Sequence, residues 1–503
     1  MGNGNKLAAR LFMAAVALAI VPACTARPVV HASTRHPNVI VFVTDDQTLG
    51  TWAAMPETLR RIVRKGVEFR RGYVSNPVCC PSRATILTGG YSHTTGVYSN
   101  GGRHGGFRAF FNNGMESRTL ASYLDPAYET ALFGKYLNHY SSYASQALDQ
   151  PGYVPPGWDE WQAFYENNSE YYDYRLNVNG RIVPYGHRPS DFSTDVIGQR
   201  LRDWLDPTDG DGRDPSQPFF AYVTPAAPHG QELASRRYGD DERFLDLPTY
   251  RSPAVDEADV RDKPTYIRRL PRLGRAGLRQ VQQRWMHQFQ SLYSLDRQIG
   301  MTLDTLREQH LLADTAIMVI SDNGQTTGEH RWRYKLVPYE RSIRVPFVVR
   351  YDRIDGGTSV DEHSLVMNAD VFATVMDLAL GPGWETPTPV DGLSLRQAIA
   401  GTQTTPLRPA ILLENLYYDR REHPSVPTYC GIVTRRWKYV VYSPPAADPT
   451  LVGGPEDHEL YDLARDPFEL RNVASQRPSI AARYRAKLAH LCDPRPPGWA
   501  VAW

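Results

Sequence analysis

Two short apolar segments, far apart in the chain, are each followed directly by carboxylate or amide side chains. Residues 38–43 (NVIVFV) and 315–320 (TAIMVI) are nearly continuous runs of β-branched and other apolar residues. Such runs are typical of strands buried on both faces, as in a parallel sheet covered by helices. The polar residues that follow them are Asp45, Asp46, Asp322 and Asn323. Because the carboxyl ends of parallel strands share one edge of a sheet, we expect these side chains to meet there.

The remaining patterns indicate a two-part α/β architecture. A further buried strand is predicted at 219–224 (FFAYVT), and apolar residues at steps of three and four predict a core-facing helix over 281–306. Gly and Pro cluster in 381–392, where we place a domain boundary. Short antiparallel strands are predicted at 410–413, 431–434 and 437–442. We therefore expect a large, mostly parallel sheet flanked by helices in 36–385, and a smaller α+β domain with an antiparallel sheet in 386–503.

The side chains after the two buried strands all offer oxygen, the ligand atom suited to Ca²⁺ or Mg²⁺. Asp-Asp and Asp-Asn-Gly are also ordinary turn sequences when taken singly. Together they predict one divalent cation. We expect Ca²⁺ rather than Mg²⁺, because Ca²⁺ tolerates a crowded, irregular oxygen shell. A third segment shares this chemistry only if Cys79 does not act as a thiol, since a thiol is a soft ligand and a poor partner for such an ion.

Residues 79–83, Cys-Cys-Pro-Ser-Arg, resemble the sulfatase signature C-x-P-S-R. The resemblance extends from Pro37 to about Ala474 and is nearest to the N-acetylglucosamine-6-sulfatase-like branch. The matching stretches are 38–47, 79–89, 134–138, 224–229 and 321–324. It implies that a formylglycine-generating enzyme oxidises Cys79 to formylglycine, an aldehyde that is hydrated at rest. The hydrate would complete the metal shell and present an oxygen nucleophile.

The resemblance also implies roles for single side chains. The hydrate at Cys79 would attack sulfur and form a covalent sulfate ester on the enzyme, which divides one hard displacement into two easier steps. Arg83 would hold the hydrate, while Lys135 and Lys335 would contact the sulfate. His229 would donate a proton to the leaving alcohol, since histidine titrates near neutral pH.

One position departs from the pattern of many arylsulfatases, which carry a histidine two residues after the lysine. Leu137 stands at that position, as it does in the N-acetylglucosamine-6-sulfatase-like branch, which also reads Lys-Tyr-Leu-Asn. The base that assists sulfate release therefore stays open. We expect Asn138 to contact the sulfate and His139 to contact the substrate.

The function that the resemblance implies is hydrolysis of sulfate monoesters on a carbohydrate, and we expect the 6-O-sulfate of an N-acetylglucosamine-type sugar. Three alternatives stay open: a broad aryl or alkyl sulfatase, a phosphonate or phosphate ester hydrolase on the same fold, and an inactive surface lipoprotein that only binds sulfated glycans. The retained Cys79, Arg83, Lys135 and His229 argue against the last. With 56 Lys and Arg against 55 Asp and Glu, the net charge of +1 creates no global field that would favour nucleic acid or an anionic membrane.

Residues 1–35 read as an export leader with a short tether. Lys6 and Arg10 precede a short apolar run at 11–21, which is too short to span a bilayer. Cys24 stands where a bacterial lipoprotein is cleaved and acylated, so a lipid anchor at Cys24 and a simple cleaved signal both stay open. We expect an exported protein that is either secreted or anchored to the cell envelope. Cys430 and Cys492 could form a disulfide or remain two buried thiols.

Overall fold

The computed structural model describes residues 1, 36–166, 170–206, 213–230, 235, 249–354, 359–386, 388, 390–417, 425–453 and 457–503. Residues 36–503 form one compact unit. The predicted leader, including Cys24, lies outside the described residues apart from Met1. The predicted division between 36–385 and 386–503 stays a prediction. No helix in the described part of the chain combines the length and the apolar character that a membrane crossing requires.

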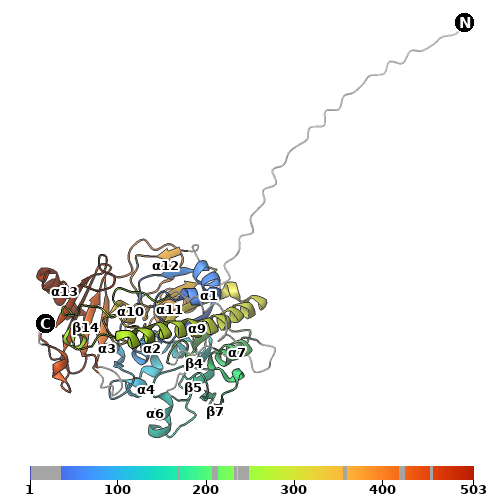
Figure 1. The fold of residues 1–503 in the computed structure, drawn as a ribbon. Coiled ribbons are helices and arrows are strands. Elements are labelled where there is room, and N and C mark those ends of the chain that lie inside the picture. Colours follow the sequence, from blue (N-terminus) through green and yellow to red (C-terminus); the bar gives the residue numbers. More distant parts are fainter. Residues whose placement is uncertain are drawn as a thin grey trace. The chain divides into compact units, whose positions relative to one another are not determined.

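A mixed sheet of ten strands forms the centre of this unit (Figure 1). The strands are β1 (Asn38–Thr44), β2 (Val67–Phe69), β4 (Glu129–Gly134), β5 (Glu160–Phe164), β6 (Arg175–Val178), β7 (Arg181–Pro184), β8 (Phe219–Thr224), β9 (Thr315–Ser321), β10 (Phe347–Arg350) and β11 (Ser359–Asp361). Their order is β11-β2-β10-β9-β1-β8-β4-β5-β6-β7, and the run from β9 to β5 is parallel. Two short strands, β3 (Gly72–Tyr73) and β12 (Val366–Met367), pair separately.

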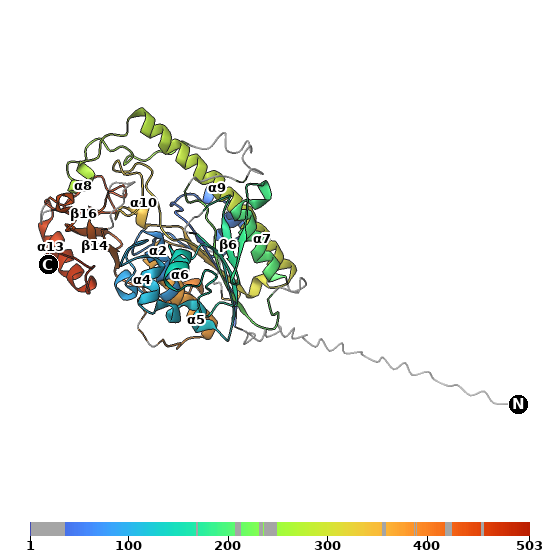
Figure 2. The ribbon, with the colours of Figure 1, turned by 90° about the horizontal axis from the view of Figure 1, so that it is seen from below.

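Helices cover both faces of the large sheet. One face carries α2 (Cys79–Thr88), α4 (Gly106–Asn112), α5 (Leu120–Leu124), α6 (Tyr140–Ala147) and α11 (Asp370–Leu380), and the other carries α1 (Pro56–Arg61), α7 (Ser193–Leu205) and α9 (Gly274–Glu308) (Figure 2). Shorter helices are α3 (Ser92–Thr95), α8 (Thr265–Arg268), α10 (Glu340–Ile343) and α12 (Arg396–Ile399). Strand β1 is buried from both sides. Val41 packs in the core on the first of these faces, and its neighbours Ile40 and Phe42 pack in the core on the second.

The strand register places the polar residues side by side. Thr44, the last residue of β1, pairs with Ser321, the last residue of β9. The segments that leave these two strands therefore start at the same edge. Gly134 at the end of β4 pairs with Thr224 at the end of β8, which brings two further segments to that edge.

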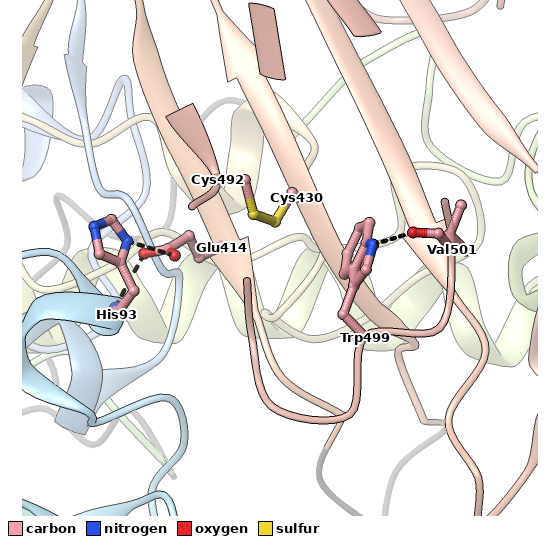
Figure 3. The surroundings of a disulfide bond; sticks show 6 residues. All are labelled: His93, Glu414, Cys430, Cys492, Trp499 and Val501. Atoms are coloured by element: carbon pink, nitrogen blue, oxygen red, sulfur yellow. Dashed lines mark hydrogen bonds and ion pairs between the residues drawn. A yellow bond between two sulfur atoms is a disulfide. The ribbon is translucent and has the colours of Figure 1, made fainter. Parts of the chain in front are cut away.

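The C-terminal region forms a separate antiparallel sheet, which confirms the predicted fold class. Its strands are β13 (Ile411–Asn415), β14 (Thr428–Val433), β15 (Trp437–Ser443) and β16 (His458–Asp462), in that order. Helix α13 (Pro478–Leu491) packs on it, and a disulfide joins Cys430 on β14 to Cys492 just after α13 (Figure 3). This settles the alternative that the sequence left open in favour of the disulfide. The edge strand β13 also contacts the N-terminal part of the chain, because His93 Nδ1 on α3 lies 2.8 Å from Glu414 Oε1 (Figure 3).

Candidate active site

The carboxylates predicted to meet at the sheet edge do so. One oxygen from each of Asp45, Asp46 and Asp322 lies within 4.8 Å of the others, and all three residues are buried. The Asp46 amide donates to Asp322 Oδ1 at 3.1 Å, and Asn323 Nδ2 donates to Asp46 Oδ1 at 2.6 Å. Asp46 has φ of 67°, a left-handed conformation that aspartate adopts more readily than most residues. These four residues, with Cys79, are called the acidic centre below.

The acidic centre fits a hard divalent cation. Three buried carboxylates and one amide supply oxygen ligands of the kind that such ions prefer. Within the part of the chain that the structure describes, Asn323 Oδ1 is buried and accepts no hydrogen bond. A buried acceptor without a partner is unfavourable unless a ligand satisfies it, so this oxygen points to an ion held beside the carboxylates.

Cys79 is the first residue of α2 and exposes only 1% of its surface. Its Sγ lies 3.6 Å from Asp45 Oδ1 and 2.7 Å from Lys335 Nζ. Pro81 falls in the first turn of this helix, where the backbone amides have no intrahelical acceptors and a proline is tolerated. Arg83 starts the second turn.

Three buried cations face the three carboxylates. Arg83 Nε donates to Asp322 Oδ2 at 2.8 Å, and Lys335 Nζ donates to Asp46 Oδ1 at 2.5 Å. Lys135, the residue after β4, donates to Asp45. The charges of the acidic centre are thus balanced inside a site from which water is largely excluded, where fixed charges act strongly.

Burial and charge compete in setting the protonation of these groups. Burial favours the neutral acid at Asp45, yet Lys135 and the neighbouring cations hold the pKa of its carboxyl well below the usual range. Burial and the charge of Asp45 raise the pKa of Asp322 to about 6. Burial also raises the pKa of the Cys79 thiol, although Lys135 and Lys335 oppose it. An unmodified Cys79 is therefore protonated at neutral pH and weakly nucleophilic.

His229 lies on the open side of the acidic centre. It follows β8, and its Nε2 is 3.8 Å from Asp46 Oδ2. Its side chain keeps 30% of its surface exposed, while desolvation of the ring lowers its pKa to about 4. Tyr171 fixes the backbone here, because its hydroxyl donates to the His229 carbonyl at 3.0 Å. One His229 nitrogen also lies within 4.8 Å of Asp45 and Cys79.

The turn after β4 directs Leu137, Asn138 and His139 to three different surroundings. Leu137 is buried in the core between the sheet and α2. Asn138 lines a small cavity with Lys135, and its Oδ1 is buried without a hydrogen-bond partner among the described residues. His139 is exposed and lines a different hollow, together with Arg108 and Gln146. The structure thus brings Asn138 beside a residue of the site, and it turns His139 toward the neighbouring hollow.

Comparison with known proteins agrees with this arrangement. The family profile described as Sulfatase matches residues 37–382, which is more than half of the chain. The chain belongs to the sulfatase family. A second profile, described as N-sulphoglucosamine sulphohydrolase, C-terminal, matches residues 328–492.

Relatives of this sulfatase carry related names. N-acetylglucosamine-6-sulfatase of Homo sapiens is 30% identical over 408 residues, which cover 80% of this chain and 71% of that protein. Extracellular sulfatase SULF-1 homolog of Drosophila melanogaster is 32% identical over 369 residues, which cover 72% of this chain and 31% of that protein. The chain thus spans less than a third of the fly protein's length.

A solved structure shows that the fold is shared. It is a complex of a protein with its substrate D-glucosamine-2-N,6-O-disulfate, and it matches with a TM-score of 0.71 at 22% identity. The match covers 91% of this chain and 98% of that chain.

Two supports of this sulfatase site escaped the sequence reasoning. Gln288 on α9 donates to the Asp46 carbonyl at 3.2 Å, although we assigned this helix no role in the site. Thr224 Oγ1 donates to the Lys135 carbonyl at 2.7 Å and so holds the turn that carries that lysine. A signal for Gln288 exists in the sequence, because it lies three residues after Trp285 and seven after Val281, on the helix face that carries the apolar stripe.

Proposed function

We propose that this chain hydrolyses sulfate monoesters, with the 6-O-sulfate of N-acetylglucosamine-type sugars as its substrate class. One observation carries the proposal: Cys79, in a sulfatase signature, lies buried among three carboxylates and three cations that come from four separate segments. The name of the human relative and the disulfated glucosamine in the similar solved structure support the choice of sugar.

Modification of Cys79 would supply the nucleophile. As a hydrated aldehyde, the side chain would offer one hydroxyl oxygen to sulfur while the bond between sulfur and the sugar oxygen breaks and the sugar leaves as an alcohol. Its second hydroxyl would later expel sulfate and restore the aldehyde. Lys335, whose Nζ lies 2.7 Å from Cys79 Sγ, would bind the sulfate oxygens. Lys135 donates to Asp45 in the same site. Arg83 donates to Asp322 and so fixes the position of that carboxylate beside the nucleophile.

The metal would be held by the acidic centre, with Ca²⁺ as the proposed ion. It would supply positive charge next to the nucleophile and the sulfate. We also propose export of the protein, because the Cys430–Cys492 disulfide persists in oxidising compartments and the fly relative is named an extracellular sulfatase.

Removal of divalent cations with a chelator is expected to abolish hydrolysis and to lower the melting temperature, because the three buried carboxylates then lose the cation that they would share. Ca²⁺ should restore both activity and melting temperature at lower concentration than Mg²⁺. Thermal melting with each ion measures binding without turnover. The Asp322→Ala variant should show no Ca²⁺-dependent shift, and full activity of the wild type in chelator would refute the metal.

The His229→Ala variant is expected to lose more activity on sugar sulfates than on activated aryl sulfates. A sugar alkoxide is a poor leaving group that needs a proton, and His229 sits at the open side of the centre, where the leaving oxygen would lie. Its pKa of about 4 leaves the free ring neutral, and the negative charge of a bound sulfate ester would raise that pKa so that the ring can carry the proton. The measurement is kcat for a series of sulfate esters whose leaving groups differ in pKa. An equal loss across the series would exclude proton donation by His229.

A substrate panel tests the proposed function as a whole. The panel holds glucosamine 6-O-sulfate, glucosamine 2-N-sulfate, an aryl sulfate and a phosphonate monoester, each assayed by kcat/KM on one preparation. We expect the highest kcat/KM for the 6-O-sulfate. A preference for the phosphonate would replace the proposal with phosphonate hydrolysis on the same fold, since a shared geometry supports both reactions at unequal rates.

A further inference from the structure

A strongly basic segment lies outside the acidic centre. Residues 261–284 contain eight cationic side chains and one acidic one, in a chain whose net charge is +1. The cations are Arg261, Lys263, Arg268, Arg269, Arg272, Arg275, Arg279 and Arg284. All except Lys263 are exposed or half-exposed. Together with Arg331 and Arg333, the seven arginines are called the arginine surface below.

Folding alone does not favour this placement of charge. Arg275 lies in the first turn of α9 and Arg279 one turn later, and α9 has no acidic residue in its first turn. The N-terminal end of a helix carries partial positive charge, so a cation there is unfavourable by about 0.3–1 kcal/mol. A bound anion would reverse the sign of that contribution. The arrangement therefore indicates an anionic partner.

The arginine surface is hollowed beside α8. A hollow of about 440 Å³ is lined by Asp259, Arg261, Arg268 and Arg331, among others. Arg331 donates to the backbone carbonyls of Glu257, Ala258 and Leu270 at 2.9–3.0 Å. These carbonyls satisfy its N–H groups without neutralising its charge. Three guanidinium groups thus face the hollow, of which Arg261 is paired with Asp259 at 2.6 Å and Arg268 lies 3.8 Å from Asp457.

The same surface continues to the loop that carries Lys335. Arg333 Nη1 donates to Gln280 Oε1 on α9 at 2.7 Å, and Arg284 Nη1 donates to the Arg333 carbonyl at 2.9 Å. Two residues further along this loop, the Lys335 amine contacts Cys79. The arginine surface and the acidic centre are therefore joined by one short segment of the chain, residues 333–335.

We propose that the arginine surface binds the anionic groups of a sulfated polysaccharide chain, one sugar of which occupies the site at Cys79. The inference rests on the proposed function and extends it from a single sulfated sugar to a polymer. A guanidinium group suits this partner, because its planar fork donates two parallel hydrogen bonds to the oxygens of a sulfate. The charges line a hollow and a helix end rather than a flat face, which favours a chain over a lipid surface.

Charge reversal on α9 tests the proposal against a matched control. The test variant carries Arg275→Glu and Arg279→Glu, and the control carries Arg483→Glu and Lys487→Glu on α13. Both pairs are exposed, lie four residues apart on a helix and change the net charge equally. Binding to immobilised heparin is measured over a range of NaCl concentrations, and kcat/KM is measured on a sulfated oligosaccharide and on an aryl sulfate.

We expect the test variant to elute from heparin at lower salt and to lose about tenfold in kcat/KM on the oligosaccharide through KM. The aryl sulfate kinetics and the control variant should match the wild type. An equal shift in heparin elution for the test and control variants would show that net charge alone sets the binding, and it would overturn the proposal. So would unchanged heparin elution of the test variant together with weaker binding to anionic lipid vesicles or to nucleic acid.

Two features keep the outcome interpretable. Heparin binding needs no turnover, so it reports on the arginine surface even if no sulfate ester is hydrolysed and the proposed function fails. The pair Arg275→Gln and Arg279→Gln, which removes charge without adding any, replaces the test variant if the glutamates impair folding. It should shift heparin elution in the same direction by a smaller amount, and unchanged elution would again contradict the proposal.

Discussion

Replacement of Cys79 by alanine is expected to lower kcat for sulfate ester hydrolysis by about 10⁴–10⁶-fold, the range seen when a nucleophile is removed from an enzyme. The other side chains of the acidic centre remain in this variant, but none of them can form the covalent ester on which we base the mechanism. The change removes one buried atom at the first position of α2, so the fold should be retained. Steady-state kinetics, with circular dichroism as the check on folding, measures the effect.

Cys80 provides the matched control. It is as buried as Cys79 and adjacent to it, and burial raises the pKa of its thiol to about 12. The Cys80→Ala variant should keep wild-type kcat. Peptide mass analysis of active protein should show that residue 79 has exchanged sulfur and two hydrogens for one oxygen. Fully active protein with an intact thiol at Cys79 would refute the proposed nucleophile.

Replacement of Lys335 by methionine is expected to lower kcat/KM by about 10²–10³-fold, or roughly 3–4 kcal/mol of transition-state stabilisation. Lys335 is buried with its amine between Asp46 and Cys79. Negative charge grows on the sulfate ester oxygen as the bond breaks, and a fixed cation in a dry site stabilises that charge. The Lys335→Arg variant keeps the charge and should retain part of the activity.

The methionine variant also leaves Asp46 without its lysine, and an unpaired buried charge destabilises a protein by about 3–5 kcal/mol. Lys263→Met separates the two effects. Lys263 is equally buried, and its partners are the carboxylates of Asp262 and Glu257. This control should lower the melting temperature while kcat/KM of the folded protein stays near wild type. Equal losses of kcat/KM in both variants would show that Lys335 acts only on stability.

The part of the site that the sequence predicts well is the part that local pattern determines. A run such as residues 38–43 has few alternatives to a buried parallel strand, and the rule that ligands bind beyond strand ends places Asp45 and Asp322 together. The register that pairs Thr44 with Ser321 does not follow from this pattern, because both strands are apolar on both faces and a shift of one residue would bury equally apolar side chains. The antiparallel sheet of the C-terminal region is likewise predicted from local signals.

Contacts that depend on the path of a long connection were harder to predict. Gln288 reaches Asp46 because α9 packs on the face of the sheet that carries Ile40 and Phe42 of β1. The apolar stripe of the helix does not determine where along the sheet the helix packs. The orientation of His139 depends on a left-handed backbone at the start of α6, a local choice that histidine makes only occasionally. The Cys430–Cys492 pairing spans 62 residues, so two thiols in the sequence are compatible with either outcome until the strands are placed.

The burial of Cys79 also sets an order of events during biosynthesis. In the folded chain its side chain is covered by the acidic centre, so a maturation enzyme cannot reach it. The signature segment leaves the ribosome well before β9, whose following residues Asp322 and Asn323 help to enclose the thiol. The oxidation that we propose for Cys79 would therefore take place on the nascent or newly exported polypeptide, and protein that folds first would stay unconverted. The yield of active enzyme from a host would then depend on how fast its oxidising machinery works relative to folding.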